Sequence, residues 1–171
     1  DVERVLADII PYNTQVSEEV LDADLAIEAK KRKLKVLMAD DSPTAVRQVQ
    51  ATLQNLGIEV VYVQDGLQAL KQLQQWVREG RSIDDEIFML ITDAEMPEMD
   101  GYMLTKTIKS DSRFAGIPVL MHSSLSGASN QQLGTSVGVD GYVTKFEPVK
   151  LSEAVSRILA DTHAQMGHYH R

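Results

Sequence analysis

Hydrophobic positions from residue 34 onward follow two alternating spacings. Short apolar runs, typical of buried strands, alternate with stretches in which apolar residues recur at i, i+3, i+4 and i+7, as on one face of a helix. The runs predict five strands, at residues 34–39, 58–63, 87–92, 117–122 and 139–143. This alternation predicts a doubly wound α/β fold, a parallel sheet with helices on both faces.

The helical stretches between these strands differ in the strength of their pattern. The stretch after the first strand has a clear apolar face, formed by Val46, Val49, Leu53 and Leu56. Residues 130–137 are polar and only weakly periodic, so the fourth helix has the weakest support. Residues 80–86 are predicted to form a solvated polar loop.

The chain extends beyond this pattern at both ends. Apolar residues at helical spacing predict a short helix that ends near Pro11, and a second helical stretch begins at Ser17. We therefore expect residues 1–33 to form a helical linker before a domain of residues 34–164. Residues 165–171 are predicted to be a flexible tail.

Charge and composition exclude several function classes. A formal net charge of −8 argues against nucleic acid and anionic membranes as partners, because both require a basic surface. No apolar run is long enough for membrane insertion, and the first residues do not resemble a signal peptide, so we expect a cytoplasmic protein. The absence of cysteine excludes disulfides and thiolate metal sites.

Polar residues follow four of the five predicted strands. Asp40 and Asp41 follow the first, Asp93 the third, Ser123 the fourth and Lys145 the fifth. Ligands of open parallel sheets bind at the carboxyl ends of the strands. In the strand order 2-1-3-4-5, the first and third strands are neighbours, so the three carboxylates are expected to lie within a few Å of one another.

These residue types together indicate cation and phosphoryl chemistry. Three adjacent carboxylates repel one another unless a cation lies between them, and Mg²⁺ suits an all-oxygen ligand set. Lys145 and Ser123 could hold the oxygens of a phosphoryl group on Asp93. Each residue alone has an ordinary explanation, since Asp40 and Asp41 could cap the next helix and Lys145 could be solvated. Their combination favours a site.

Four segments, each containing one of these strand ends, resemble the receiver domains of bacterial two-component systems. They are Asp40-Asp41, Asp93 with residues 96–101, residues 118–123 and residues 141–145. The resemblance covers about residues 34–163 and implies a flavodoxin-like fold with the sheet order 2-1-3-4-5. It also implies a signalling phosphoacceptor rather than an enzyme, which takes a phosphoryl group from a histidine kinase onto Asp93 and loses it by slow autodephosphorylation.

The resemblance also implies the metal ligands, position by position. Asp41 and Asp93 would bind Mg²⁺ or Mn²⁺ directly. Asp40 would bind the cation directly or through water. The backbone carbonyl of Glu95 would complete the protein ligands.

Other positions are implied to respond to the phosphoryl group. Ser123 takes the place of the family's hydroxyl residue, which shifts toward the phosphoryl group. Tyr142 takes the place of the aromatic switch, which turns inward when the hydroxyl moves. Tyr142 could equally be a half-buried core aromatic. Glu95 and Leu125 flank the expected path of the hydrolytic water and are implied to tune dephosphorylation.

One position departs from the family pattern. Receiver domains usually have proline after the lysine, often joined by a cis bond, whereas Phe146 follows Lys145 here. A cis bond before phenylalanine would cost roughly 3–4 kcal/mol. The sequence therefore leaves the geometry of this bond open.

The upstream residues suggest a narrower resemblance. Residues 1–11 and the linker, followed by a receiver with the segment 121–124, look similar to CheV-type chemotaxis coupling proteins, which join a CheW-like domain to a C-terminal receiver. Residues 1–33 would then be the remnant of the coupling domain. The implied partners are a chemotaxis histidine kinase and, beyond it, a chemoreceptor and a coupling protein.

Three alternatives are weaker. Residues 134–138 match the serine-hydrolase pattern G-x-S-x-G, but that site needs a strand before the serine and a helix after it, the reverse of the order predicted here. Asp93-Ala94-Glu95 only imitates the acid pair of haloacid-dehalogenase phosphatases. A receiver fold used only for binding is disfavoured by the presence of Asp41, Asp93 and Lys145.

Overall fold

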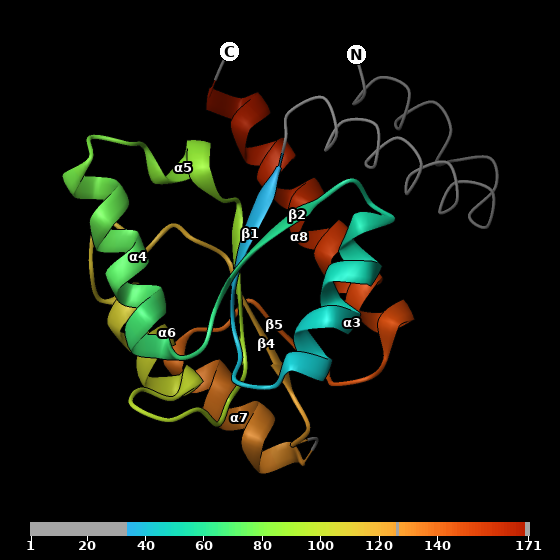
Figure 1. The fold of residues 1–171 in the computed structure, drawn as a ribbon. Coiled ribbons are helices and arrows are strands. Elements are labelled where there is room, and N and C mark those ends of the chain that lie inside the picture. The colour runs from blue at the N-terminus through green and yellow to red at the C-terminus, as the bar shows by residue number, and fades with distance from the viewer. Residues whose placement is uncertain (1–33, 126, 170–171) are drawn as a thin grey trace, which may run out of the picture.

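The protein is a five-stranded parallel sheet between two layers of helices (Figure 1). The computed structural model describes residues 34–125 and 127–169, with side chains up to residue 162. The sheet order is β2-β1-β3-β4-β5, as predicted. The strands are β1 (Lys35–Ala39), β2 (Glu59–Val63), β3 (Met89–Thr92), β4 (Val119–Ser123) and β5 (Gly141–Thr144).

Both faces of the sheet carry helices. One apolar cluster joins the sheet to α3 (Pro43–Gln54) and α8 (Pro148–Tyr169). A second cluster joins its other face to α4 (Gly66–Arg78) and α6 (Gly101–Lys109). Figure 1 shows these two pairs on opposite sides of the sheet, and α7 (Ala128–Val137) packs beside α6. The predicted doubly wound architecture is confirmed.

The strand boundaries differ slightly from the predicted ones. The predicted third strand began at Ile87, whereas β3 begins at Met89. The Ile87 amide bonds to the carbonyl of Ile83, so it closes a helical turn instead of joining the sheet. The predicted fourth strand began at residue 117, whereas β4 begins at Val119, after a proline that has no N–H to donate.

The prediction of a polar loop at residues 80–86 is wrong in part. Residues Ile83–Glu86 form a short helix, α5, and Ile83 packs into the second apolar cluster. A single apolar residue gives no periodicity, so the sequence pattern could not show this turn. The segment is anchored to the core through Ile83.

The weakly predicted fourth helix is present as α7. Gly134 is the only buried residue in it, and Gly138 ends it in the left-handed conformation at φ 100°. The G-x-S-x-G segment therefore lies at the end of a helix that precedes a strand, as predicted. The hydroxyl of Ser136 donates to the carbonyl of Leu133 inside the helix, so no nucleophile elbow is formed there.

The ends of the chain are described only in part. The predicted linker of residues 1–33 lies outside the described residues. Helix α8 continues to Tyr169, past the predicted domain end at residue 164, and the flexibility expected for residues 165–171 stays a prediction. Among the helices that the structure describes, none is long and apolar enough to cross a membrane.

Candidate functional site

Strands β1 and β3 bring three carboxylates together at the carboxyl end of the sheet. Ala39 pairs with Thr92 in the last register position of these strands, and the Asp93 amide donates to the Ala39 carbonyl at 2.9 Å. Asp40, Asp41 and Asp93 therefore emerge side by side. Each offers a carboxylate oxygen, and these oxygens lie within 4.8 Å of one another.

The two acids after β1 have different environments. Asp40 is fully buried, and its Oδ1 accepts a hydrogen bond from the Ser42 amide at 2.9 Å. Asp41 is exposed. The cap of α3 is the Ser42 hydroxyl, which accepts from the Ala45 amide at 3.3 Å. The alternative view of Asp40 and Asp41 as helix caps is therefore incorrect, because Ser42 caps α3.

Lys145 lies between two of the carboxylates. Its Nζ is 3.0 Å from Oδ2 of Asp40 and 3.1 Å from Oδ2 of Asp93. Burial opposes the charged ammonium, but the hydrogen bonds and charges of Asp40 and Asp93 outweigh it, so the pKa of Lys145 is raised. Lys145 is therefore a fixed positive charge in the acidic cluster, not a solvated lysine.

Asp93 is held by a backbone donor and by Lys145. Its Oδ1 accepts a hydrogen bond from the Ala94 amide at 2.8 Å, and its other oxygen faces Lys145. Burial and the charge of Asp40 raise the pKa of Asp93, while Lys145 and the Ala94 amide oppose this rise. The carboxylate is thus partly desolvated but oriented by two donors.

The loop after β3 closes tightly on Asp93. The Gly101 amide donates to the Ala94 carbonyl at 2.9 Å, and a Cβ at Gly101 would lie 2.0 Å from the Asp93 carbonyl oxygen. The Gly66 amide at the start of α4 donates to the Met99 carbonyl at 3.1 Å. Two glycines therefore allow the backbone to approach closely enough to fix the loop.

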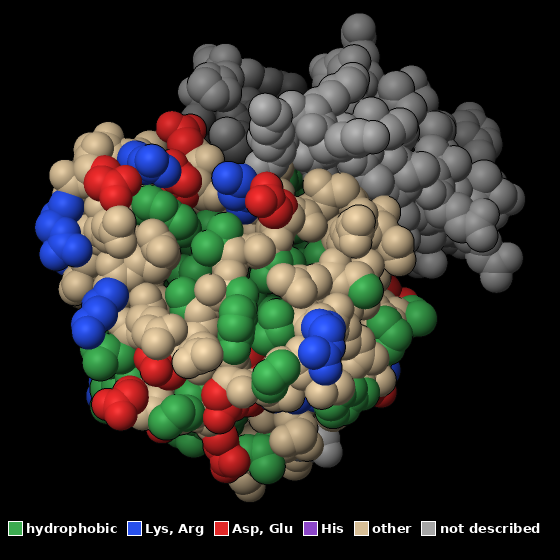
Figure 2. Space-filling model, viewed as in Figure 1, with side chains coloured by type: hydrophobic (Ala, Val, Ile, Leu, Met, Phe, Trp, Pro, Cys, Tyr) green, Lys and Arg blue, Asp and Glu red, His purple; other side chains and the backbone are tan. Residues whose placement is uncertain are grey.

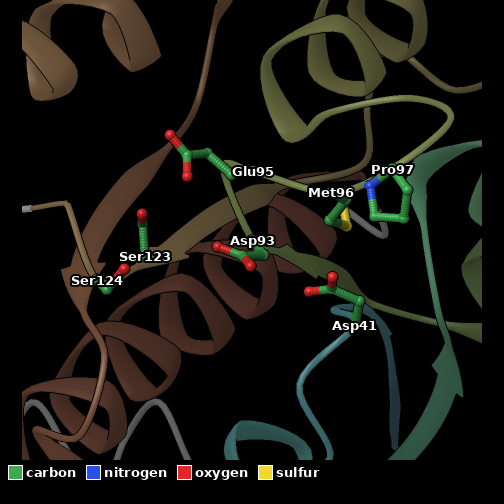
Figure 3. Close-up of a pocket in the computed structure, with 7 residues that line it drawn as sticks. All are labelled: Asp41, Asp93, Glu95, Met96, Pro97, Ser123 and Ser124. Carbon is green, nitrogen blue, oxygen red and sulfur yellow. The ribbon is translucent and has the colours of Figure 1, made fainter.

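An open pocket of about 460 Å³ lies over these groups. Figure 3 shows Asp41 on one side of Asp93, and Glu95 on the other side, above Ser123. The lining residues are Asp41, Asp93, Glu95, Met96, Pro97, Ser123 and Ser124. Figure 2 shows acidic side chains gathered at the lower edge of the view, where β1 and β3 end. The pocket therefore opens at an acidic end of the molecule.

Ser123 and Tyr142 are linked through the loop after β4. Ser123 is buried, and its Oγ accepts a hydrogen bond from the Leu125 amide at 3.1 Å. The Tyr142 hydroxyl donates to the Leu125 carbonyl. The structure thus connects the pocket hydroxyl to the aromatic residue through one loop residue.

The bond after Lys145 is trans, because the described residues contain no cis peptide. The chain turns instead at Phe146, which has φ 66° and an exposed ring. The Lys145 amide donates to the Ser123 carbonyl at 2.8 Å. This backbone hydrogen bond holds Lys145 at the end of β5 even though the usual proline is absent.

Two residues near the site, His122 and Tyr102, were not predicted from the sequence. His122 is 3% exposed, its Nδ1 has no hydrogen-bond partner, and burial and then the charge of Lys145 lower its pKa to about 4. Tyr102 lies beside Tyr142. His122 could have been singled out from the sequence, because it is a polar residue inside a mostly apolar strand. Nothing in the pattern of α6 distinguished Tyr102 from an ordinary surface tyrosine.

The fold and the site together define a class: an α/β domain with acids, a lysine and a hydroxyl at the carboxyl end of its sheet. The sequence profile of the response regulator receiver domain matches residues 36–156. The chain therefore belongs to the response regulator receiver domain family, as its motifs predicted. This family is a signalling phosphoacceptor family.

Individual relatives are chemotaxis proteins. The chain is 36% identical over 127 residues to the chemotaxis protein CheY1 of Helicobacter pylori strain 26695, a match that covers 74% of this chain and 97% of that one. It is similar to the high-resolution structure of the chemotaxis response regulator CheY4 of Vibrio cholerae with a TM-score of 0.62 and 31% identity, over 73% of this chain and 98% of that one.

A second group of relatives aligns beyond the receiver domain. The chemotaxis protein CheV2 of Helicobacter pylori is 30% identical over 160 residues, covering 94% of this chain and 49% of that protein. CheV3 of the same strain is 32% identical over 162 residues, with 93% and 50% covered. The chain thus spans about half the length of these relatives, and the predicted resemblance to CheV proteins is confirmed.

Proposed function

We propose that Asp93 is the phosphoryl acceptor of this receiver domain and that a divalent cation assists the transfer. The observation that carries this proposal is the arrangement of Lys145, which contacts both Asp40 and Asp93 within 3.1 Å, while Asp93 also lines an open pocket. Such a cluster joins an oriented carboxylate to a fixed positive charge.

Asp41 and Asp93 are proposed as direct carboxylate ligands of the cation, because both line the pocket. Asp40 is fully buried and does not line it, so we assign Asp40 to a water-mediated or supporting role. The backbone carbonyl of Glu95 is the fourth proposed ligand. The all-oxygen donor set suits Mg²⁺ or Mn²⁺, which when bound would neutralise charge on the transferring phosphoryl group.

In the proposed transfer, one oxygen of the ionised Asp93 carboxylate forms a bond to phosphorus. The P–N bond to a phosphohistidine of the kinase breaks, and the imidazole nitrogen keeps the electron pair. Lys145 and the Ser123 hydroxyl would bind the other phosphoryl oxygens, since they lie at the neighbouring strand ends. Lys145 would then exchange its contact with Asp93 for one with the phosphoryl group.

Ser123 and Tyr142 are proposed as the switch. A shift of the Ser123 hydroxyl toward the phosphoryl group would alter its hydrogen bond to the Leu125 amide, and Tyr142 bonds to the carbonyl of the same residue. We also assign the tuning of autodephosphorylation to Glu95 and Leu125. Glu95 supports this, because its side chain lies over the Ser123 side of Asp93 in Figure 3.

The binding partners of this protein are inferred from its relatives. CheY and CheV proteins are named as chemotaxis proteins, so we propose a chemotaxis histidine kinase as the phosphoryl donor. The match to CheV proteins beyond the receiver domain supports a role in the coupling of receptor and kinase, with chemoreceptor and coupling protein as further partners. A cytoplasmic location is part of this proposal.

Acetyl phosphate provides a direct test. We expect incubation with acetyl phosphate and Mg²⁺ to add the mass of one phosphoryl group to the intact protein. Asp93→Asn and chelation of the cation should each remove this adduct. An adduct of equal yield in Asp93→Asn would show that the acceptor is another residue.

A further inference from the structure

Tyr142 is held inward by three different elements. It is the second residue of β5, and its hydroxyl donates to the Leu125 carbonyl in the loop after β4. Its ring lies against Gly134 of α7, where a Cβ would be 3.4 Å from Cδ2 of Tyr142. The single buried position of α7 is therefore the position that makes room for this ring.

A second tyrosine hydroxyl lies beside it. Tyr102 is the second residue of α6, and its hydroxyl oxygen is buried without a hydrogen bond of good geometry. Burial, and then the neighbouring Tyr142 hydroxyl, raise the pKa of Tyr102 to about 12. Asp100 and Glu95 add to this rise. Like any tyrosine hydroxyl at neutral pH, the Tyr102 hydroxyl is protonated and can donate a hydrogen bond.

The hydrogen-bonding capacity of the two hydroxyls is complementary. Tyr142 has one hydrogen, which goes to the Leu125 carbonyl, but its oxygen still has lone pairs to accept with. Tyr102 has a hydrogen and no acceptor for it. A buried donor without an acceptor is unfavourable, so a small rotation of the Tyr102 hydroxyl toward Tyr142 would be favoured.

We propose that Tyr102 is a positioning residue that holds Tyr142 inward by donating a hydrogen bond to the Tyr142 hydroxyl. The contact would extend the path from Ser123 through Leu125 and Tyr142 to the first turn of α6. This inference rests on the proposed role of Tyr142 as a switch residue. With this contact, α6 would also respond to a phosphoryl group in the pocket.

The first turn of α6 is well placed for such a role. Gly101, directly before Tyr102, packs against the Asp93 carbonyl and bonds to Ala94. Tyr102 therefore lies between the loop that follows β3, which begins at Asp93, and Tyr142. A change in the inward position of Tyr142 would change the hydroxyl that lies beside the Tyr102 hydroxyl.

The test compares Tyr102→Phe, Tyr142→Phe and the double variant, all made in the full chain. Beryllofluoride with Mg²⁺ serves as the phosphoryl probe. We expect Tyr102→Phe to weaken beryllofluoride binding about fivefold, the effect of one hydrogen bond of ordinary strength. In the Tyr142→Phe background, where the accepting hydroxyl is gone, the same substitution should have no further effect.

Equal weakening in both backgrounds would overturn the inference, because Tyr102 would then act without Tyr142. The matched control is Thr107→Val, which removes a hydroxyl that bonds only to the Met103 carbonyl on the same helix. We expect this control to bind beryllofluoride as the wild type does. No weakening by Tyr102→Phe in the wild-type background would also overturn the inference.

A second readout does not depend on phosphorylation chemistry. In protein labelled with 3-fluorotyrosine, we expect Tyr102→Phe to shift or broaden the fluorine resonance of Tyr142 without any ligand, while the Tyr62 resonance stays unchanged. An unchanged Tyr142 resonance would refute the contact. If the wild type failed to bind beryllofluoride, the proposed function would fail, and this measurement would still decide the contact between the tyrosines.

Discussion

Lys145 is the residue on which the electrostatics of the pocket depend. Its side chain is 8% exposed and contacts two buried acids, and no other cation contacts Asp40 or Asp93 in the part of the chain that the structure describes. Partners in a buried ion pair depend on each other, since removing one leaves an uncompensated charge. Lys145 is therefore expected to be needed for stability, in addition to the phosphoryl binding proposed for it.

We expect Lys145→Ala to lower the free energy of unfolding by roughly 3 kcal/mol without added cation. The variant should also bind beryllofluoride far more weakly. Mg²⁺ should restore part of the lost stability, because it supplies the missing positive charge. Urea unfolding checks this, with Lys150→Ala as the control, since Lys150 forms an exposed pair with Glu147. Equal effects of the two substitutions would contradict the assignment.

His122 gives a prediction about pH. Its pKa of about 4 in the folded protein lies below its ordinary value of 6.5, so the unfolded chain binds more protons between these values. The contribution of neutral His122 is complete above pH 6.5 and is lost as the pH falls toward 4. The shift corresponds to roughly 3 kcal/mol.

Replacing His122 with leucine removes this titration. Between pH 7 and pH 4 we expect the wild type to lose roughly 3 kcal/mol more unfolding free energy than His122→Leu, measured by urea unfolding at each pH. The other histidines are present in both proteins and cancel in the comparison. Parallel pH profiles for the two proteins would show that His122 does not titrate as the structure implies.

At the scale of elements, the loop between β3 and α6 sets the geometry of Asp93. A Cβ at Gly101 would lie 2.0 Å from the Asp93 carbonyl oxygen, a clash that only backbone movement can relieve. We expect Gly101→Ala to destabilise the protein by about 1–3 kcal/mol and to weaken Mg²⁺ binding. Gly116→Ala is the matched control, since a Cβ there meets nothing within 4 Å.

Thermal unfolding with and without Mg²⁺ measures both effects of this substitution. The control should stay within about 0.5 kcal/mol of the wild type. If Gly101→Ala left both stability and cation binding unchanged, the loop would not hold Asp93 in the way described here.

The sequence predicted the elements better than the contacts between them. Short apolar runs bounded by polar residues were enough to predict all five strands, and the residues at their ends predicted which acids converge. The helical turn at Ile83 was missed because one apolar residue carries no period. The sequence could not predict that Tyr102 lies beside Tyr142, since this depends on how α6 and β5 pack.

The sequence predicted Lys145 beside the acids but not its individual contacts with Asp40 and Asp93. The strand ends predicted that these groups share one edge of the sheet. They did not predict that Asp40 would face the lysine and be excluded from the pocket, while Asp41 faces the solvent. The buried Asp40 also accepts a hydrogen bond from the Ser42 amide, a contact that the sequence pattern did not show.

For the whole molecule, cation binding and stability are linked, because the three carboxylates converge only in the folded state. At Mg²⁺ concentrations of about a hundred times its Kd, we expect a stabilisation of about 2.7 kcal/mol. For a chain of this size that is a rise in Tm of roughly 5–10 °C. Asp41→Ala and Asp93→Asn should greatly reduce this rise.

Asp84→Asn serves as the control for these two variants. Asp84 is an exposed acid on α5, which precedes β3, whereas the pocket lies where β3 ends. We expect its variant to keep the full rise in Tm with Mg²⁺. A full rise in Asp41→Ala and Asp93→Asn would mean that the cation binds elsewhere.

The central claim is that the fold selects Asp93, among many acids, as the phosphoryl acceptor. The most direct measurement is to phosphorylate the chain, reduce the acyl phosphate with borohydride and map the resulting homoserine by peptide mass spectrometry. Homoserine at position 93 and at no other aspartate is the expected result. Homoserine at Asp40 or Asp41, or spread over several surface acids, would contradict the account.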